Sequence, residues 1–444
     1  MTKRAAMRLV FLSFVCLLPV NEGVAAQSAE VASAKGQVNA PAELKFVVIL
    51  SRHGVRPPLT KPGAIDQFSA APWPKWDVPP GYLTAHGYEL MKMFGAWDRA
   101  RLARQGLFAG EGCNAAVYAT IVADSDQRTR ETGKALAEGM FPGCPIKVHA
   151  RAVGTPDPLF RIAGGLHGAD SALASAAIEG RIGGDPRALT EAYQSQMAAL
   201  DRVLAGCGHA SASTTRRTSL FDIPDAPGDR AEYFTRYRGR LVVASTLAEN
   251  LLLEYTNGMS DADTGWGCVD GATLRTLMQV DTAAWNYAFR TPTVARMYAS
   301  NLLDHIELSM EQSVTGKPVA GALSEPDDRL LIIVGHDTNI VTIAGALGID
   351  WIIDGRVDDT PPGGALLFEL WRPADGGRPF VRLEYTAQTL EQMRQLQPLT
   401  PANPPASAQI FVPGCSRKDM SCSWDGFSAA VHASIDPAYV NPQP

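Results

Sequence analysis

Residues 45–58 read KFVVILSRHGVRPP, and this stretch decides the fold class. An apolar run passes directly into a polar segment that ends in prolines, which is typical of a buried strand and the loop that follows it. Residues 329–339, RLLIIVGHDTN, repeat the pattern and lead into a predicted helix over 338–347. The two units predict an α/β domain whose reactive side chains lie at the C-terminal ends of its strands, where open α/β sheets place their ligands.

The chain alternates strands and helices at both ends around a helical middle. Residues 116–123 predict another strand, followed by the polar segment DSDQRTR at 124–130, and residues 365–371 and 380–385 predict two late strands. Alanine-rich helical segments dominate from about residue 168 to residue 310. We therefore expect a discontinuous α/β catalytic domain, residues 43–167 and 311–435, with a mostly helical insertion domain at residues 168–310.

Composition excludes several classes of protein. The chain has 444 residues, 40 Lys+Arg against 46 Asp+Glu, a formal net charge of −6 and 46% hydrophobic residues. These values are those of a globular protein rather than of a disordered, collagen-like or coiled-coil chain. A mildly acidic chain without a basic block also predicts no nucleic-acid partner.

The N-terminus predicts export. Basic residues at positions 3, 4 and 8 precede an apolar stretch over 9–20, and small residues at 24–26 place a cleavage site before Gln27. The apolar stretch is too short for a spanning helix, although a membrane anchor or a buried helix is the alternative. A signal peptide at residues 1–26 predicts a periplasmic or secreted protein without a membrane partner. Its removal takes Cys16 and leaves six of the seven cysteines.

The residues that follow the predicted strands form a candidate anion site with a nucleophile. Arg52 and Arg56 can bind phosphate oxygens in a bidentate manner, and His53 between them can attack phosphorus. His336 adds a donor, Asp337 can protonate a leaving oxygen, and Arg128 can complete the clamp. Alone, the Arg-His-Gly motif could be a surface loop, and the His-Asp motif could be a hydrogen-bonded pair with a structural role. Their joint occurrence at strand ends favours a catalytic site. Three arginines can supply the positive charge, so we expect no metal and no cofactor.

Together these motifs resemble the signature pair of the histidine acid phosphatases. WPKW at 73–76, RTR at 128–130, PDPLF at 156–160 and PPGG at 361–364 are similar to the bacterial periplasmic phytase and glucose-1-phosphatase branch. The resemblance implies a phosphoglycerate mutase-like α/β domain with a helical insertion domain. It implies His53 as a nucleophile that forms phosphohistidine, Asp337 as proton donor, and these phosphate ligands: Arg52, Arg56, Arg128 and His336. It also places Glu249 facing the pocket, although an exposed helix charge is an equal alternative.

The resemblance also bears on the disulfides. It supports a bond between Cys113 and Cys144, and Cys415–Cys422 would close a short C-terminal loop. Cys207 and Cys268 then remain as a pair that departs from the family pattern. Six cysteines allow several pairings, so this last pair rests on elimination.

The resemblance implies a monomeric phosphomonoesterase that acts at acid pH on a small phosphate monoester. Phytase (myo-inositol hexakisphosphate) or broad acid phosphatase activity is favoured, with a glucose-1-phosphatase-like sugar phosphatase as the alternative. Leu59 and Thr60 stand where phytases tend to have Thr-Lys, and Lys61 lies one residue beyond the expected lysine. A phosphoglycerate mutase-like transferase is disfavoured by the signal peptide and the insertion. A non-catalytic protein that binds phosphorylated ligands is disfavoured by the intact His53 and Asp337.

Overall fold

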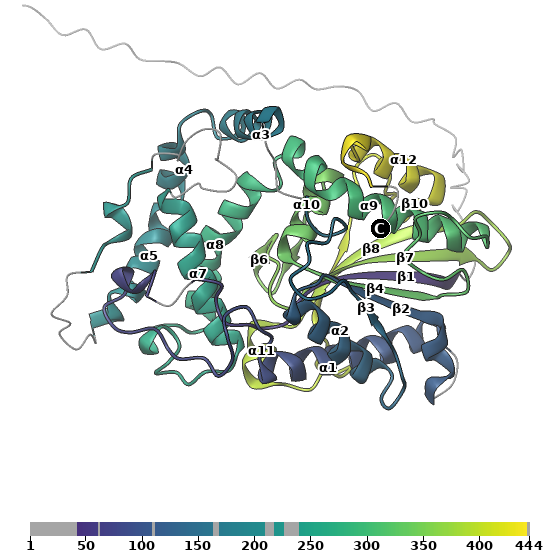
Figure 1. Cartoon of the computed structure of the whole chain (residues 1–444), viewed down its shortest axis with the longest axis horizontal. Coiled ribbons are helices and arrows are strands. Elements are labelled where there is room, and N and C mark those ends of the chain that lie inside the picture. The colour runs from purple at the N-terminus through teal and green to yellow at the C-terminus, as the bar shows by residue number, and fades with distance from the viewer. Residues whose placement is uncertain are drawn as a thin grey trace, which may run out of the picture. The chain divides into compact units, whose positions relative to one another are not determined.

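A mixed eight-stranded sheet organises the computed structural model of the chain (Figure 1). The described residues are 42–60, 63–108, 112–162, 168–208, 217–225 and 239–441, so the expected signal peptide lies outside them. Residues 40–444 form one compact unit. The sheet order is β10-β8-β7-β1-β4-β2-β3, with β9 paired to β8. The strands are β1 (Ala42–Arg52), β2 (Ala119–Ala123), β3 (Val148–His149), β4 (Leu330–Gly335), β7 (Ala365–Pro373), β8 (Phe380–Ala387), β9 (Ala406–Ile410) and β10 (Cys422–Ser423).

The middle of the sheet is parallel. Strand β1 pairs in parallel with β4, which pairs in parallel with β2, and β7 closes the other side of β1 in the antiparallel sense. Arg52 lies in register with Gly335, and Ala123 lies in register with Val334. The three polar segments that follow β1, β2 and β4 therefore leave the sheet at one edge, as the sequence predicted.

Helices cover both faces of this sheet. Helices α1 (Ala85–Arg104) and α2 (Gln127–Met140) pack on one face, while α9 (Pro292–Thr315), α10 (Asp337–Leu347) and α12 (Trp424–Ser434) pack on the other (Figure 1). Alternate residues of β1 enter the two cores, because successive strand side chains point to opposite faces. Burial on both faces explains why β1 and β4 read as continuous apolar runs.

A second core lies among helices from the middle of the chain. These helices are α4 (Pro186–Ala192), α5 (Gln194–Leu204), α7 (Arg240–Thr256) and α8 (Gly271–Ala288), and α11 (Leu390–Gln395) joins them. Helix α3 (Gly168–Arg181) packs instead against α9 in a small separate cluster. Helix α9 itself packs on α10 and β1, so the last helix of residues 168–310 contributes to the core of the sheet. The division into two domains remains a prediction.

One local detail differs from the sequence expectations. The strand expected over 116–123 begins only at Ala119, because Gly112–Tyr118 form a 3-10 helix. A two-residue hairpin pair, β5 (Ile352–Ile353) and β6 (Arg356–Val357), lies outside the main sheet. The six cysteines of the described chain pair as Cys113–Cys144, Cys207–Cys268 and Cys415–Cys422.

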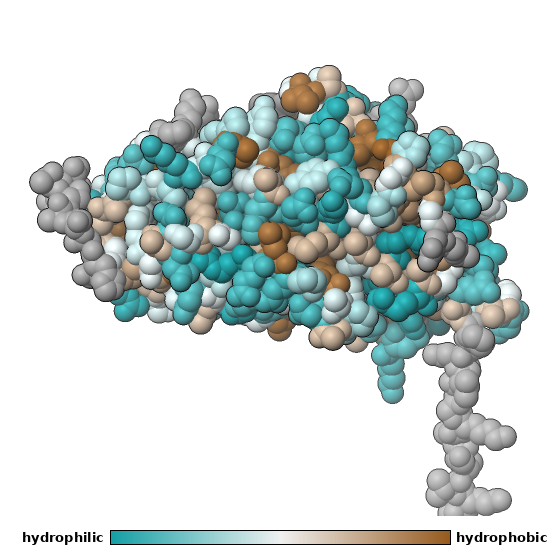
Figure 2. All heavy atoms as spheres, turned by 90° about the horizontal axis from the view of Figure 1, so that it is seen from below, coloured by the Kyte–Doolittle hydropathy of each residue, from teal (hydrophilic) through white to brown (hydrophobic). Residues whose placement is uncertain are grey.

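The surface mixes polar and apolar residues. On the face shown in Figure 2, hydrophobic residues occur in small groups among hydrophilic ones. No helix among the described residues has the length and apolar character that crossing a membrane requires.

Candidate active site

Backbone hydrogen bonds fix the loop that carries His53 at the edge of the sheet. The His53 amide donates to the Gly335 carbonyl over 3.0 Å, and the Gly363 amide donates to the His53 carbonyl over 3.0 Å. The Asp124 amide donates to the Val334 carbonyl over 3.0 Å. These hydrogen bonds therefore connect the segments that follow β1, β2 and β4 with the loop that precedes β7.

Gly54 lets this loop pass close to α1. A Cβ atom at this position would lie 2.9 Å from the side chains of both Leu83 and Met91 and 3.1 Å from the Gly87 carbonyl oxygen. The Gly54 amide also donates to Thr132 of α2 over 2.9 Å. The glycine of the Arg-His-Gly motif therefore serves close backbone packing, which anchors the histidine beside it.

His53 is held as a neutral imidazole with a free Nε2. Its Nδ1 lies 2.8 Å from the Gly54 carbonyl oxygen, which can only accept, so Nδ1 carries the proton. The side chain is buried, and burial together with Arg128, Arg56 and Arg52 lowers its pKa well below 6.5. These groups favour the neutral imidazole, whose Nε2 carries a lone pair.

Two arginines and two carboxylates surround this imidazole. Arg52 Nη2 lies 2.6 Å from Glu249 and 2.8 Å from Asp337, and Arg56 Nη2 lies 3.1 Å from Glu249. Arg52 Nη1 also donates to the Thr360 carbonyl over 2.5 Å. Glu249 of α7 thus faces the pocket rather than lying on an exposed helix face.

The arginines retain donors that the protein does not use. The Nε groups of Arg52, Arg56 and Arg128 are buried and find no hydrogen-bond acceptor among the described residues. Buried N–H groups without a partner are costly, and oxygens of a bound anion would satisfy them. The three guanidinium groups thus favour an oxyanion ligand.

Asp337 begins helix α10 beside the two arginines. Burial raises its pKa, but Arg52, Arg56 and His336 with the Thr338 amide outweigh burial and hold the pKa below its usual range. The Thr338 amide donates to its Oδ1 over 2.7 Å. An anion that takes up the arginines' charge would remove much of this attraction, and the pKa of Asp337 would then rise.

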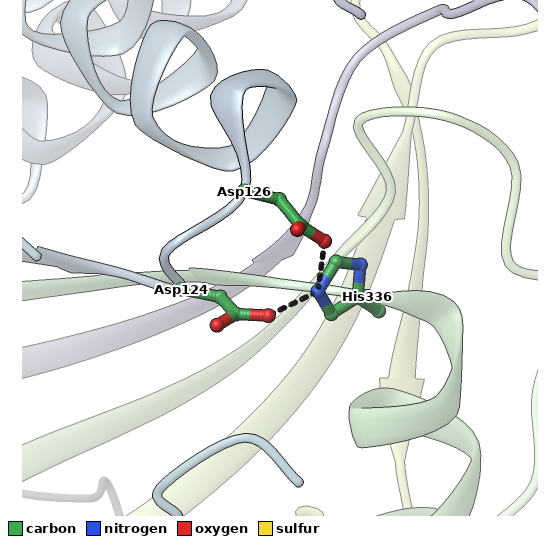
Figure 3. A group of neighbouring side chains, drawn as sticks. All are labelled: Asp124, Asp126 and His336. Atoms are coloured by element: carbon green, nitrogen blue, oxygen red, sulfur yellow. Dashed lines mark hydrogen bonds and ion pairs between the residues drawn. The ribbon is translucent and has the colours of Figure 1, made fainter. Parts of the chain in front are cut away.

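His336 is oriented by a pair of carboxylates from the β2–α2 loop (Figure 3). Its Nε2 lies 2.6 Å from Asp124 and 3.6 Å from Asp126, which assigns the proton to Nε2 in the ligand-free site. Arg161 contacts the same two carboxylates at 2.6 and 2.5 Å, and Arg128 contacts Asp126 at 2.8 Å. The ligand atoms of Asp124, Asp126 and His336 lie within 4.8 Å of one another, but guanidinium groups already balance both carboxylates.

The structure brings all seven expected site residues together. The pocket at the edge of the sheet is lined by His53, Arg56, Arg128, Glu249, His336 and Asp337, and Arg52 contacts two of these side chains. Sequence reasoning did not assign Asp124, Asp126 and Arg161 to the site. Their signal was present, since Arg161 directly follows the PDPLF motif and both aspartates follow β2.

The far wall of the pocket was not foreseen. It carries aromatic residues from the α8–α9 region, Trp285, Phe289 and Tyr298, together with Leu59 and Ile162. Lys61, which the sequence placed near a polyphosphorylated substrate, lies outside the described residues.

Comparison with known proteins agrees with this arrangement. Residues 43–205 and 243–386 match the histidine phosphatase superfamily (branch 2). The chain belongs to this family. It is a histidine acid phosphatase, so the predicted family, fold class and phosphomonoesterase activity are confirmed.

Relatives of this histidine acid phosphatase carry two names. Phytase AppA of Escherichia coli (strain K12) is 35% identical over 416 residues, covering 91% of this chain and 95% of that protein. Glucose-1-phosphatase of Salmonella typhimurium (strain LT2) is 29% identical over 378 residues, covering 84% and 88%. The structure of Hafnia alvei phytase in complex with tartrate matches with a TM-score of 0.82 at 34% identity and covers 91% of this chain and 100% of that chain.

Proposed function

We propose that this phosphatase hydrolyses phosphate monoesters through a phosphohistidine at His53. The observation that carries the proposal is the neutral, buried His53 beside three arginines with unused buried donors. Arg52, Arg56 and Arg128 hold the phosphate oxygens, and His336 becomes a fourth donor when its Nδ1 takes up a proton beside the bound anion. Fixed positive groups around phosphorus stabilise the charge that develops during transfer.

The first step transfers phosphate to nitrogen. His53 Nε2 attacks phosphorus as the bond from phosphorus to the ester oxygen breaks, and Asp337 gives its proton to the leaving oxygen. The bound phosphate neutralises Arg52 and Arg56, so the pKa of Asp337 rises and its acid form is populated at acid pH. Products are the free alcohol, phosphohistidine and the Asp337 carboxylate.

The second step returns the enzyme to its starting state. The Asp337 carboxylate takes a proton from a water molecule, whose oxygen attacks phosphorus as the phosphorus–nitrogen bond breaks. Inorganic phosphate leaves with His53 again neutral, and Asp337 gives up its proton once Arg52 and Arg56 attract its carboxylate again. Asp124 holds His336 in position throughout both steps, because its carboxylate accepts a hydrogen bond from Nε2.

Trapping of the intermediate tests this proposal. The full-length protein is mixed with a ³²P-labelled monoester and quenched into alkaline detergent, which preserves phosphohistidine. Label that is then released by acid identifies a phosphorus–nitrogen bond. We expect label on the wild type and on His149→Ala, an exposed histidine of β3, but none on His53→Ala. Hydrolysis without trapped label under rapid mixing, or label that survives acid, would contradict the mechanism. Binding without hydrolysis would favour the non-catalytic alternative.

Export and oligomeric state complete the proposal. We propose a periplasmic or secreted monomer that loses residues 1–26, supported by the basic and apolar pattern of that segment and by the three disulfides. N-terminal sequencing of the exported protein should begin at Gln27, and size-exclusion chromatography with light scattering should give the mass of one chain.

A further inference from the structure

The pocket that contains His53 has an aromatic side, which we call the aromatic wall: Trp285, Phe289 and Tyr298. The Trp285 and Phe289 rings stack with centroids 4.9 Å apart and planes at 28°, and Tyr298 meets Phe289 edge-on at 5.7 Å. All three side chains are partly exposed. Large aromatic surfaces that face a pocket rather than a core are suited to packing against a ligand.

The aromatic wall continues into a second, more apolar pocket. This neighbouring pocket shares Glu249, Trp285 and Phe289 with the first and is otherwise lined mainly by aliphatic residues, among them Ile178, Ile182, Leu241 and Ala284. It also contains Asp281, whose carboxylate accepts a hydrogen bond from Ser245 over 2.7 Å. Burial, together with the nearby Glu249, raises the pKa of Asp281 well above its usual value, which favours the neutral form of this group. The space beyond the phosphate site is therefore largely uncharged.

The positive charges of the first pocket are already matched by carboxylates. Arg56 is paired with Glu249, Arg128 with Asp126, and Arg161 with both Asp124 and Asp126. Among the described residues that line the pocket, no lysine and no further arginine is present. A ring with six phosphates would bring five charged groups beyond the one attacked, and any of them that met the aromatic wall would lie against apolar surface.

Building on the proposed phosphatase activity, we propose that the preferred substrate carries a single phosphate on an uncharged leaving group with a flat apolar face, and that this face packs on Trp285. The arginines hold the phosphate, while Trp285, Phe289 and Tyr298 select the leaving group. Phytate, which the sequence favoured, is then a poor substrate.

A matched pair of substrates tests the aromatic wall. Ethyl phosphate and 2-phenylethyl phosphate release alcohols of similar basicity, so their chemistry is alike and only the ring differs. We expect kcat/KM to be about tenfold higher for 2-phenylethyl phosphate, because one ring face leaves water. The ratio of the two values within one variant does not depend on the fraction of folded enzyme. Trp285→Ala should reduce the ratio to about two or less, whereas Trp285→Phe and the control Phe411→Ala, an exposed aromatic that lines none of these pockets, should retain it.

Glucose 1-phosphate and phytate complete the design. We expect glucose 1-phosphate to be hydrolysed with a kcat/KM between those of the two alkyl esters, since a sugar presents a partly apolar face, and to lose activity in Trp285→Ala. A ratio near one in the wild type, or a ratio that Trp285→Ala leaves unchanged, would overturn the proposal. So would a phytate kcat/KM above that of 2-phenylethyl phosphate. These results would leave the phosphatase activity standing, whereas failure to hydrolyse every ester would overturn the proposed function itself.

Discussion

The two sides of the pocket are built by different means. On the phosphate side, His53, Arg128 and His336 follow the ends of neighbouring strands and are tied together by the register of the sheet. On the opposite side, Trp285 and Tyr298 project from two helices, and Leu59 at the lip is 57% exposed. The phosphate side is dense with paired charges, and the aromatic wall is held mostly by packing.

This contrast separates chemistry from selectivity. Phosphate transfer requires donors fixed relative to phosphorus, which backbone hydrogen bonds of a sheet provide. Choice of the leaving group requires only a surface of suitable shape and polarity, which side chains of helices can vary without disturbing the strands. Substitutions on the phosphate side should therefore lower the rate on every substrate, whereas substitutions in the aromatic wall should change the ratio of rates between substrates.

The largest effect is expected at the nucleophile. His53→Ala removes the proposed nucleophile, and kcat should fall about a thousandfold or more on every monoester. His149→Ala serves as the matched control. A loss confined to one substrate would show that His53 selects the substrate rather than carrying out phosphate transfer. Such a result would contradict the division of chemistry and selectivity between the two sides of the pocket.

Asp337→Asn should slow alkyl esters more than aryl esters. An alkoxide leaves poorly without a proton, so kcat on 2-phenylethyl phosphate should fall about a hundredfold or more, and kcat on p-nitrophenyl phosphate should fall less. Loss of the acid should also remove the alkaline limb of the kcat profile for the alkyl ester, since this limb reports deprotonation of Asp337 in the complex. Equal losses on both substrates with an unchanged profile would contradict the acid role.

Asp124→Asn tests positioning on the phosphate side. The variant keeps the size of the side chain but removes the charge that fixes His336, and we expect kcat/KM to fall about tenfold on all substrates. The substrate ratio defined by the aromatic wall should stay constant. Weaker inhibition by inorganic phosphate is the readout that a general loss of stability would not produce.

Leu59→Lys would place a positive charge at the exposed position of Leu59, which lines the same pocket as the aromatic wall. A cation there meets a peripheral phosphate of phytate, and we expect kcat/KM on phytate to rise several-fold while that on 2-phenylethyl phosphate changes little. Leu59→Met is the uncharged control. An equal rise in both variants would assign the effect to shape, and a fall on phytate would argue against charge as the limiting property.

The last prediction concerns stability, and it compares two buried acids, one in a helix that covers the sheet and one among the helices of the second core. Burial raises the pKa of Asp98 in α1 to about 6 and that of Glu254 in α7 to about 8. The folded state binds these protons more tightly than the unfolded chain, so each acid favours folding more as pH falls through its folded pKa towards its unfolded value. For Asp98 the change from pH 8 to pH 4 is on the order of 3 kcal/mol.

Calorimetry can separate the two acids. The Tm difference between Asp98→Asn and the wild type should shift in favour of the wild type between pH 8 and pH 4, and Glu254→Gln should show the same trend beginning at a higher pH. The exposed Asp425→Asn should show no such trend. A difference independent of pH would mean that these acids keep their ordinary pKa in the folded protein.

The structure brings together the residues that the sequence predicted for the phosphate side, because local signals coincide there. Continuous apolar runs mark β1 and β4 as doubly buried, and the reactive residues follow each run directly. The contacts of Glu249 with Arg52 and Arg56 depend on where α7 lies relative to the end of β1, which helical periodicity alone does not encode. Trp285 and Tyr298 resemble ordinary core residues in a sequence, since an aromatic side chain at helical spacing reads the same whether it faces a core or a pocket. Their exposure depends on how α8 and α9 are placed relative to β4.

The course of β1 also determines when the enzyme becomes active. Arg52 donates to Thr360, 308 residues further along the chain, and pairs with Glu249, 197 residues away. Strand β1 is made early but gains its neighbours β4 and β7 only when most of the chain exists. Contacts between such distant segments form late and slowly. A growing chain therefore contains His53 before its phosphate site is complete, and we expect no attack on phosphate esters before the C-terminal third has joined the sheet.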